Sequence, residues 1–270
     1  MTTINDYHVD PLLIGFWERN SLKNMYKKNK DKVYIIDGME RSGKSTFAIQ
    51  QACVIEPSLL ENPDKLCSRI VFSAEDFNKI CRETKNGVII FDEAFRGFAS
   101  RSSMSRVNKK LIQTLMEMGQ NNNIVFIVLP RVFMLDIYPA MLRSNALFNI
   151  YESRKDGKRH WRYYCYNDKN KIYQAGIKKG WNYIFDSKIN GRFFGKFPGG
   201  EEFNKAYLAK KAIAFKGVIK SEDEYELLAK EVNNMHKMGM TYEKIAEIKG
   251  FSTAKARFLC VKAKRATTLD

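Results

Sequence analysis

Residues 33–49 read VYIIDGMERSGKSTFAI, and this stretch decides the fold. Val33 to Ile36 form a short run of β-branched and aromatic residues, which is typical of a buried strand. A segment compatible with a helix follows from Lys44 to Ile55. Between the two lies a loop with a glycine at each end, Gly38 and Gly43. The stretch therefore predicts a strand, a tight loop and a helix in direct succession.

The loop matches the pattern GxxxxGK[ST] at every fixed position, between a strand and a helix as that pattern requires. Its glycines let backbone N–H groups point inward, and the N-terminus of the helix adds positive potential for a β-phosphate. We expect Lys44 to reach the β- and γ-phosphates of ATP and the Ser45 hydroxyl to bind Mg²⁺. The predicted nucleotide-binding residues are Gly38, Met39, Glu40, Arg41, Ser42, Gly43, Lys44, Ser45 and Thr46.

A second apolar run, residues 88–91, ends in two adjacent carboxylates, Asp92 and Glu93. Such a pair after a buried strand is costly unless a cation faces it. We interpret Asp92 as a ligand of the metal and Glu93 as the base that activates the attacking water. Because Glu93 supplies a base, we favour ATP hydrolysis over nucleotide binding alone and over kinase transfer.

Other apolar runs predict strands at residues 70–72, 124–129 and 146–151, and an amphipathic helix over 105–119. Apolar strands that alternate with helices indicate an α/β fold with a mainly parallel sheet covered on both faces.

The chain changes character after residue 151. Asp156-Gly157 predicts a hairpin turn whose second arm is residues 159–166, and the glycine-rich residues 167–200 suit an irregular extension. The pair Ser221 and Glu224 has capping-box spacing, which predicts a helix start, and two more helices are expected after it. We predict an N-terminal arm (1–30), an ATPase core (31–155), a basic aromatic-rich extension (156–220) and a C-terminal helix-turn-helix-like domain (221–270).

Composition narrows the class of protein. The 270 residues are 44% hydrophobic, so a packed core is expected and wholesale disorder is excluded. The net charge of +16 favours a polyanionic partner, either nucleic acid or an anionic membrane face. Residues 151–220 alone hold 17 basic and 6 acidic residues. No apolar run has the length of a spanning helix and the start does not resemble a signal peptide, so we expect a cytoplasmic protein without an integral membrane segment.

Cysteine and histidine usage gives no sign of a metal cluster. The five cysteines are scattered and never at CxxC spacing, and the three histidines lie far apart in the sequence. We therefore expect free, mostly buried thiols.

Together, GMERSGKS and VIIFDEA resemble P-loop ATPases of the additional-strand, catalytic-glutamate division. More narrowly, DEAFRGFASRSSMSR, NNNIVFIVLP and MLRSNALFNIYE resemble motor ATPases of viruses and mobile elements. These include viral genome-packaging ATPases, FtsK/HerA-type translocases and zonula-occludens-toxin-like phage proteins. The resemblance implies a RecA-like core with ATP and Mg²⁺ as cofactors, acting in a homo-oligomeric ring that moves DNA. Viral capsid or portal proteins, or replication proteins, are then possible partners.

The chain departs from this resemblance at one place. Many FtsK/HerA-like enzymes end the strand after that of the catalytic glutamate in a polar sensor, often Gln. Here Leu129-Pro130 stands at that place. The sensor is therefore missing or displaced onto Asn123 or Arg131.

A ring motor also needs a cation against the charge that develops on the γ-phosphate, commonly an arginine from the neighbouring subunit. Arg143 is the first candidate because the resemblance places such a finger just before the last strand. Arg101 and then Arg106 follow, and Arg96 and Arg131 complete the candidates. For each one, the alternative is a solvated surface arginine or a contact with DNA phosphate.

Two basic segments are predicted to contact DNA. The first surrounds the Asp156-Gly157 turn and comprises Arg154, Lys155, Lys158 and Arg159. The second lies in residues 241–265, which resemble the helix-turn-helix of sigma factors and resolvases and hold Lys255, Arg257 and Lys262. The predicted inward positions of this motif are Ile245, Ala246, Ile248, Phe251, Ala256 and Leu259. The alternative is a helical bundle that docks on the core or on a neighbouring subunit.

These observations predict an ATP-hydrolysing DNA motor, in particular a packaging or translocation ATPase of a virus or mobile element. No spaced acidic residues typical of a nuclease follow the core, which disfavours a complete large terminase. One alternative is a replication or transposition accessory protein of the helicase-loader type, which would use ATP as a switch. Another is a phage assembly or export ATPase at the membrane, with its basic region facing lipid headgroups.

Overall fold

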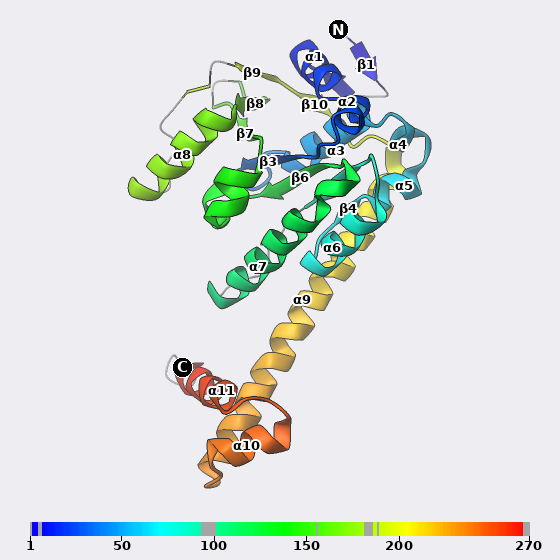
Figure 1. Cartoon of the computed structure of the whole chain (residues 1–270). Coiled ribbons are helices and arrows are strands. Elements are labelled where there is room, and N and C mark those ends of the chain that lie inside the picture. The colour runs from blue at the N-terminus through cyan, green and yellow to red at the C-terminus, as the bar shows by residue number, and fades with distance from the viewer. Residues whose placement is uncertain are drawn as a thin grey trace. The chain divides into compact units, whose positions relative to one another are not determined.

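Strand β3 lies in the middle of a seven-stranded sheet with the strand order β4-β5-β6-β3-β7-β8-β9 (Figure 1). This computed structural model describes residues 2–4, 7–92, 101–154, 156–180, 186–187 and 189–266; the side chains of residues 2–4, 7, 101–106, 215–226 and 264–266 are outside that description. The strands of the sheet are β3 (Lys32–Gly38), β4 (Ile70–Val71), β5 (Val88–Phe91), β6 (Ile124–Leu129), β7 (Ala146–Glu152), β8 (Arg159–Tyr164) and β9 (Ile189–Arg192).

Five neighbouring strands of this sheet are parallel. β3 pairs in parallel with β6 and β7, and β5 pairs in parallel with β4 and β6. β8 runs antiparallel to β7, and β9 runs antiparallel to β8. The prediction of a mainly parallel α/β sheet is therefore confirmed, with the strands at 88–91 and 124–129 at the predicted bounds. The carboxyl ends of the parallel strands meet at one edge, which we call the carboxyl edge.

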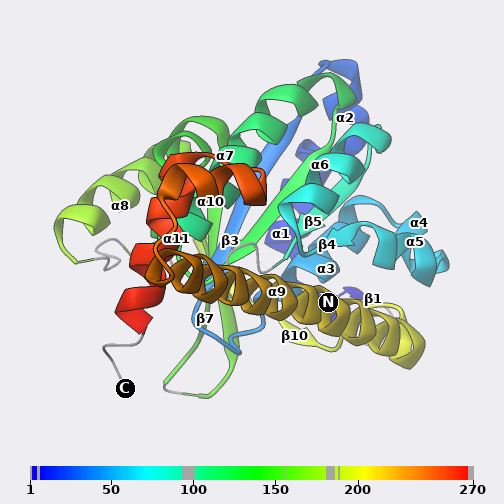
Figure 2. The same ribbon diagram turned by 90° about the horizontal axis from the view of Figure 1, so that it is seen from below.

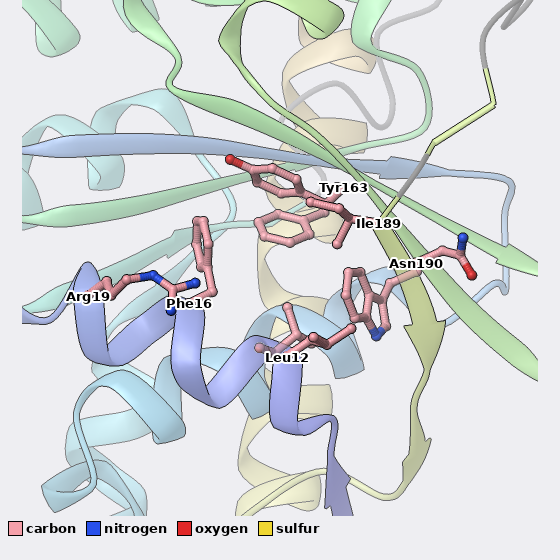
Figure 3. Close-up of a pocket in the computed structure, with 9 residues that line it drawn as sticks. Leu12, Phe16, Arg19, Tyr163, Ile189 and Asn190 are labelled. Atoms are coloured by element: carbon pink, nitrogen blue, oxygen red, sulfur yellow. The ribbon is translucent and has the colours of Figure 1, made fainter.

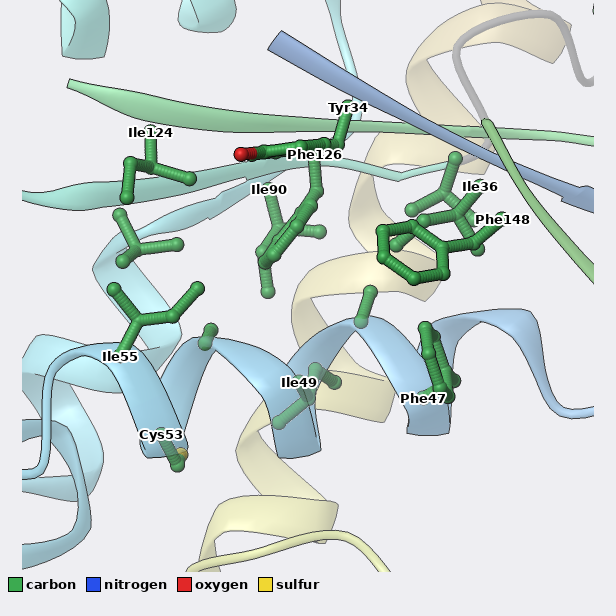
Figure 4. Close-up of a cluster of buried hydrophobic side chains, with 14 of the residues drawn as sticks. Tyr34, Ile36, Phe47, Ile49, Cys53, Ile55, Ile90, Ile124, Phe126 and Phe148 are labelled. Carbon is green, nitrogen blue, oxygen red and sulfur yellow. The ribbon is translucent and has the colours of Figure 1, made fainter. Parts of the chain in front are cut away.

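Alternate residues of each central strand point to opposite sides of the sheet, and helices cover both sides. Both faces of the sheet are therefore buried. Tyr34, Ile36 and Phe126 pack on one face with helix α3 (Lys44–Ile55), which begins and ends where the sequence predicted (Figure 4). Phe47 of α3 points toward the sheet in this layer, whereas Ile49 lies on the side of α3 that faces away from the sheet. The same side carries α1 (Pro11–Arg19), α2 (Leu22–Lys27), α4 (Ser58–Glu61) and α5 (Pro63–Ser68).

The opposite face is buried by a second layer of helices, which lies toward the viewer in Figure 2. Phe77 stacks on Phe91 of the sheet, and Leu111 and Leu115 are fully buried in the same cluster. This layer contains α6 (Ala74–Glu83), α7 (Arg101–Glu117), α8 (Tyr166–Lys178), the 3₁₀ turns η1 (Met118–Asn121) and η2 (Val132–Met134), and the π-helix η3 (Tyr138–Arg143).

The described part of residues 1–30 is folded onto the core. Trp17 is buried and donates its indole N–H to Gln51 Oε1 of α3 at 2.8 Å. A small antiparallel sheet joins β1 (Thr2–Ile4), β2 (Tyr7–Val9) and β10 (Phe194–Gly195), so the start of the chain pairs with a segment near residue 195.

Residues 167–200 are more regular than the sequence predicted. Their first part forms α8, whose Ile172 and Tyr173 are buried beneath the sheet. A helix was missed because Gly176 suggested a loop; here Gly176 instead lies against the Phe133 ring, where a side chain would collide. The prediction of an irregular segment is wrong for this part.

The chain divides into two compact units, Met1–Lys211 and Ala212–Asp270, and the boundary falls inside helix α9 (Gly200–Lys237). Because α9 is continuous from Gly200, the prediction that Ser221 caps a new helix is wrong. Ser221 and Glu224 have the spacing of a capping box, but they lie in the interior of a helix because the residues on both sides of them are helical as well.

The second unit packs α10 (Tyr242–Lys249) and α11 (Thr253–Ala266) against the last turns of α9. Thr241 caps α10 through its side chain, and Gly250 ends that helix in the left-handed conformation with φ 68°. Ile245, Ala246, Ala256 and Leu259 are buried as predicted, and Phe251 is half-buried. Ile248 is 56% exposed, so its inward assignment is wrong. Whether these helices act as a helix-turn-helix stays a prediction.

Among the helices of the described residues, none combines the length and the apolar composition needed to cross a membrane.

We predict that Gly38→Ala lowers the free energy of unfolding by about 2 kcal/mol or more. Gly38 has φ 152°, and a Cβ there would collide with the carbonyl oxygen of Ile150 on β7. Urea unfolding followed by tryptophan fluorescence measures this unit, since Trp17, Trp161 and Trp181 all lie before residue 212.

The control for this variant is Gly119→Ala, where a Cβ would meet nothing within 4 Å, and we expect a change of less than about 1 kcal/mol. Equal stabilities of the two variants would show that the β3–β7 approach at Gly38 does not constrain the fold.

Candidate functional site

Four chain segments meet at the carboxyl edge of the sheet. The loop after Gly38 leaves β3, Asp92 follows β5, Arg131 follows β6 by two residues, and Glu152 ends β7. The register Gly38↔Ile150 aligns the ends of β3 and β7. The open carboxyl edge of a parallel sheet is where ligands of such folds bind, so this edge is the candidate site.

The loop between β3 and α3 has the geometry of an anion-binding turn. Arg41 and Gly43 adopt positive φ values of 62° and 94°, and Gly43 is the N-cap of α3 without a side-chain cap. The first N–H groups of a helix have no intrahelical partner and therefore favour an anion. Lys44 Nζ donates to the carbonyl oxygens of Gly38 (2.9 Å) and Met39 (2.7 Å), so its ammonium lies over the loop.

A buried hydroxyl in the loop lacks a partner. Ser42 is 4% exposed, and its Oγ has no hydrogen bond to any part of the chain that the structure describes. An unpaired buried hydroxyl is costly unless a further group satisfies it. A phosphate oxygen in the loop would satisfy it, so the loop fits the phosphate groups that its sequence predicted.

Ser45 and Asp92 come together from different segments. The Ser45 hydroxyl, in the first turn of α3, donates to Asp92 Oδ1 at 3.0 Å, and Asp92 itself is fully buried. A hydroxyl and a carboxylate beside a phosphate loop are the hard oxygen donors that Mg²⁺ prefers. The pair therefore fits the Mg²⁺ predicted there. Within the described ranges no three His, Cys, Asp or Glu side chains gather to hold a metal, so phosphate and water oxygens would complete its ligands.

The second oxygen of Asp92 has a partner that the sequence did not suggest. Tyr207, near the start of α9, donates its hydroxyl to Asp92 Oδ2 at 2.7 Å and is 2% exposed. Lys210, one turn later, donates to the carbonyls of Cys67 (2.8 Å) and Ile70 (2.6 Å). These bonds fix the first turns of α9 at the carboxyl edge. The 115 residues between Tyr207 and Asp92 left no spacing pattern by which to find the contact.

Asp37, the last residue before Gly38, is a second buried carboxylate at this edge. It accepts hydrogen bonds from Val132 N–H (3.0 Å) and from the Asn149 side-chain amide (3.0 Å). Burial raises the pKa of Asp37 to about 7, although these hydrogen bonds and the charges of Arg131 and Lys44 act in the opposite direction. Asp37 thereby connects β3 to two other segments, the one that follows β6 and strand β7.

Several predicted catalytic residues belong to the part of the chain around residues 93–106. Glu93 and Arg96 lie outside the described residues, and so do the side chains of Arg101 and Arg106 on α7. Their catalytic roles stay predictions.

Arg143, the first candidate for an arginine finger, lies at the opposite edge of the sheet from the phosphate loop of its own chain. It pairs with Asp31, which directly precedes β3, and donates to the carbonyl of Leu115 (3.0 Å); its side chain is 15% exposed. This pairing gives Arg143 a structural role within the unit. Its role as a finger stays a prediction that would require the pair with Asp31 to open.

The two sensor candidates are separated by the fold. Asn123 is fully buried at the amino end of β6, where its side chain accepts from Gly87 N–H (3.1 Å) and donates to Thr84 O (2.8 Å). Asn123 therefore lies at the wrong edge for a sensor, and that assignment is wrong. Arg131 lies at the carboxyl edge, 3.7 Å from Met39 Sδ of the phosphate loop, so a sensor there stays a prediction.

The predicted DNA-binding residues around the Asp156-Gly157 turn differ in exposure and in the groups that they face. Arg154 and Lys158 are exposed on the connection between β7 and β8, and Lys155 is outside the described residues. Arg159, the first residue of β8, instead points toward the phosphate loop: a Cβ added to Gly43 would lie 3.1 Å from its Cδ. In the second unit, Lys255, Arg257 and Lys262 are exposed on α11, with Arg257 3.6 Å from Glu243.

A separate hollow of about 330 Å³ lies between α1 and the edge formed by β8 and β9 (Figure 3). Its walls are mainly apolar, with Leu12 and Phe16 from α1 facing Tyr163 and Ile189, and Arg19 at one end. No residue of the phosphate loop lines it. It is therefore distinct from the carboxyl-edge site.

No protein-family model matches the chain, and no curated protein matches it. A solved structure with a detectable likeness is the N-terminal domain of zonular occludens toxin from Neisseria meningitidis. The match has a TM-score of 0.37 and 15% sequence identity, and it covers 62% of this chain and 95% of that one. A TM-score this low decides nothing about function. The coarse resemblance to a P-loop ATPase is carried by the sheet and the loop described above.

We predict that Tyr207→Phe lowers the free energy of unfolding of the first unit by about 1 to 3 kcal/mol, since it deprives the buried Asp92 carboxylate of a hydrogen-bond donor. Urea unfolding followed by tryptophan fluorescence tests this. Tyr166→Phe is the matched control, because Tyr166 is 42% exposed, and it should change stability by less than about 0.5 kcal/mol. Two variants of equal stability would remove the role assigned to the Tyr207 hydroxyl.

Proposed function

We propose that the chain is a Mg²⁺-dependent ATPase that acts as a DNA motor, with genome packaging or translocation in a virus or mobile element as its specific task. The observation that carries the ATPase proposal is the 3.0 Å contact between Ser45 Oγ and Asp92 Oδ1 beside the phosphate loop. Lys44, the buried Ser42 hydroxyl without a partner in the described part of the chain, and the N-terminus of α3, which has no side-chain cap there, support it.

Each residue has a distinct task in the proposed reaction. Lys44 and the loop N–H groups would bind the phosphates of ATP, and Ser45 with Asp92 would hold Mg²⁺. The metal, when bound, supplies positive charge to the phosphate oxygens. Glu93 would orient a water and accept its proton.

The proposed reaction is hydrolysis of the γ-phosphate of ATP by water. The water oxygen bonds to the γ-phosphorus while the bond from that phosphorus to the β–γ bridging oxygen breaks. ADP leaves with the bonding electrons, and the proton taken by Glu93 passes to the product phosphate.

The DNA-motor part of the proposal rests on charge and on the resemblance of the sequence. Arg154 and Lys158 are exposed on the turn after β7, at the same edge as the phosphate loop. A polyanion bound there would lie beside the nucleotide, which supports coupling between DNA contact and hydrolysis. The homo-oligomeric ring and its viral or replication partners belong to the same proposal.

We predict that Lys44→Ala abolishes ATP binding, whereas Glu93→Gln retains ATP binding and lowers kcat by about 100-fold or more. A fluorescent nucleotide measures binding, and phosphate release measures turnover. The controls are Lys79→Ala and Glu75→Gln, exposed residues of α6 that should leave both quantities unchanged. Binding that survives Lys44→Ala, or turnover that survives Glu93→Gln, would contradict the mechanism.

We predict that replacing Arg154 and Lys158 together by alanine weakens DNA binding and lowers the slope of log affinity against log salt by roughly 1 to 2. Fluorescence anisotropy with labelled duplex and single-stranded DNA measures both. The matched control is Lys79→Ala with Lys85→Ala, which removes the same charge from another exposed surface. An unchanged salt slope would contradict the assignment.

The two alternative functions can be distinguished from a DNA motor with the same protein preparation. DNA should stimulate ATP turnover, and the motor should displace a protein roadblock, which a helicase-loader-type accessory protein should not. Binding to anionic vesicles without any response to DNA would favour the assembly or export ATPase and overturn the motor.

A further inference from the structure

We propose that Arg159 supplies, within the same chain, the cation that contacts the terminal phosphate of ATP. This inference rests on the proposed ATPase function, and it assigns to the same chain a role that the resemblance to ring motors assigned to an arginine of a neighbouring subunit. It also moves Arg159 from the predicted DNA-binding set to the nucleotide site.

The backbone of Arg159 is fixed at the carboxyl edge from two sides. On one side it pairs with Glu152 of β7, two residues beyond Ile150, which is aligned with Gly38. On the other side its carbonyl accepts from Phe193 N–H at 3.2 Å, just after β9. Pairing with both neighbouring segments fixes the backbone of Arg159 at this edge and therefore the direction in which its Cα–Cβ bond leaves the strand.

That direction is toward the phosphate loop. A Cβ added to Gly43 would lie 3.1 Å from Arg159 Cδ, 3.3 Å from its Nε and 3.2 Å from the Phe193 ring. The guanidinium therefore begins in contact with Gly43, the N-cap of α3. Since the N–H groups that follow this glycine are those expected to bind phosphate, Arg159 stands beside the anion site.

No acidic group in the described ranges forms an ion pair with Arg159. The acid of the nearby turn, Asp156, lies 3.3 Å from Arg192 and 3.7 Å from His160 instead. Arg143, in contrast, is paired with Asp31 at the other edge. Glu152, the residue opposite Arg159 on β7, is exposed and forms no ion pair with it within the described ranges. A half-buried arginine beside a phosphate loop, without an ion-paired carboxylate there, is suited to a bound phosphate.

A guanidinium in this position would contact the phosphate oxygens where charge is spread as the bond to the leaving group breaks. An arginine that acts in its own chain makes each subunit complete for hydrolysis. An arginine from a neighbour makes hydrolysis depend on assembly. The two arrangements therefore differ in how turnover responds to mixing of variants.

The first test separates charge from packing. Arg159→Met keeps an unbranched stem against Gly43 and removes the guanidinium, and Arg192→Met, on the adjacent strand, is the matched control. We expect Arg159→Met to weaken ATP binding by about 10-fold while ADP binding changes less than 3-fold, and to lower kcat by about 100-fold. Arg159→Lys should recover part of kcat, and Arg192→Met should match the wild type.

The second test separates action within one chain from action between chains. Lys44→Ala has Arg159 but lacks the loop lysine, and Arg159→Met has the opposite defect. If Arg159 acts in its own chain, mixtures of the two variants show no more turnover than the sum of the separate proteins, at protein concentrations where the wild type assembles.

The outcomes decide the inference separately from the proposed function. Weaker ATP binding with nearly unchanged ADP binding in Arg159→Met, together with no recovery on mixing, supports it. Wild-type behaviour of Arg159→Met overturns it and leaves the ATPase intact, and so does recovery of turnover on mixing, which would place the cation in trans. A wild-type protein that binds no ATP would overturn the proposed function and this inference together.

Discussion

Strand β3 pairs in parallel with β6 on one side and β7 on the other, and β6 pairs in turn with β5; together these pairings bring four chain segments to one edge of the sheet. The register is held because both faces of β3 are buried: a shift of one residue would exchange Tyr34 and Ile36 with Val33 and Ile35 between two filled layers. Gly38 then has to pass close to Ile150, where only a glycine fits. The register of the sheet therefore sets the positions of the phosphate loop, Asp92 and Arg131.

The parts that could be predicted are those whose signal is local. The loop from Gly38 to Ser45 is a contiguous pattern between a strand and a helix, and the strands at 88–91 and 124–129 are uninterrupted apolar runs with clear ends. Asp92 was assigned because it directly follows such a run. Each of these depends on fewer than about ten neighbouring residues.

What the sequence could not reveal depends on contacts between distant segments. Tyr207 is 115 residues from Asp92, and nothing in its own helix distinguishes it from a surface tyrosine. Helix α9 runs through Ser221 because the residues before it are helical as well, which a four-residue capping pattern does not report. Asn123 precedes β6 and Arg131 follows it. The direction of β6 in the sheet therefore decides which of the two residues can reach a nucleotide.

The surplus of basic residues in 151–220 has to be reinterpreted in the same way. Lys169 is fully buried and donates to carbonyls at the end of the π-helix, including Met141 O at 3.0 Å, and burial lowers its pKa to about 8. Lys210 holds the carbonyls of Cys67 and Ile70. Arg159 faces the phosphate loop. A basic residue whose charged group is directed into the fold adds less to the attraction of an external polyanion than an exposed one does. A count of charges along the sequence therefore overstates the charge available to DNA, and a DNA contact has to be tested at exposed basic residues of this segment such as Arg154 and Lys158.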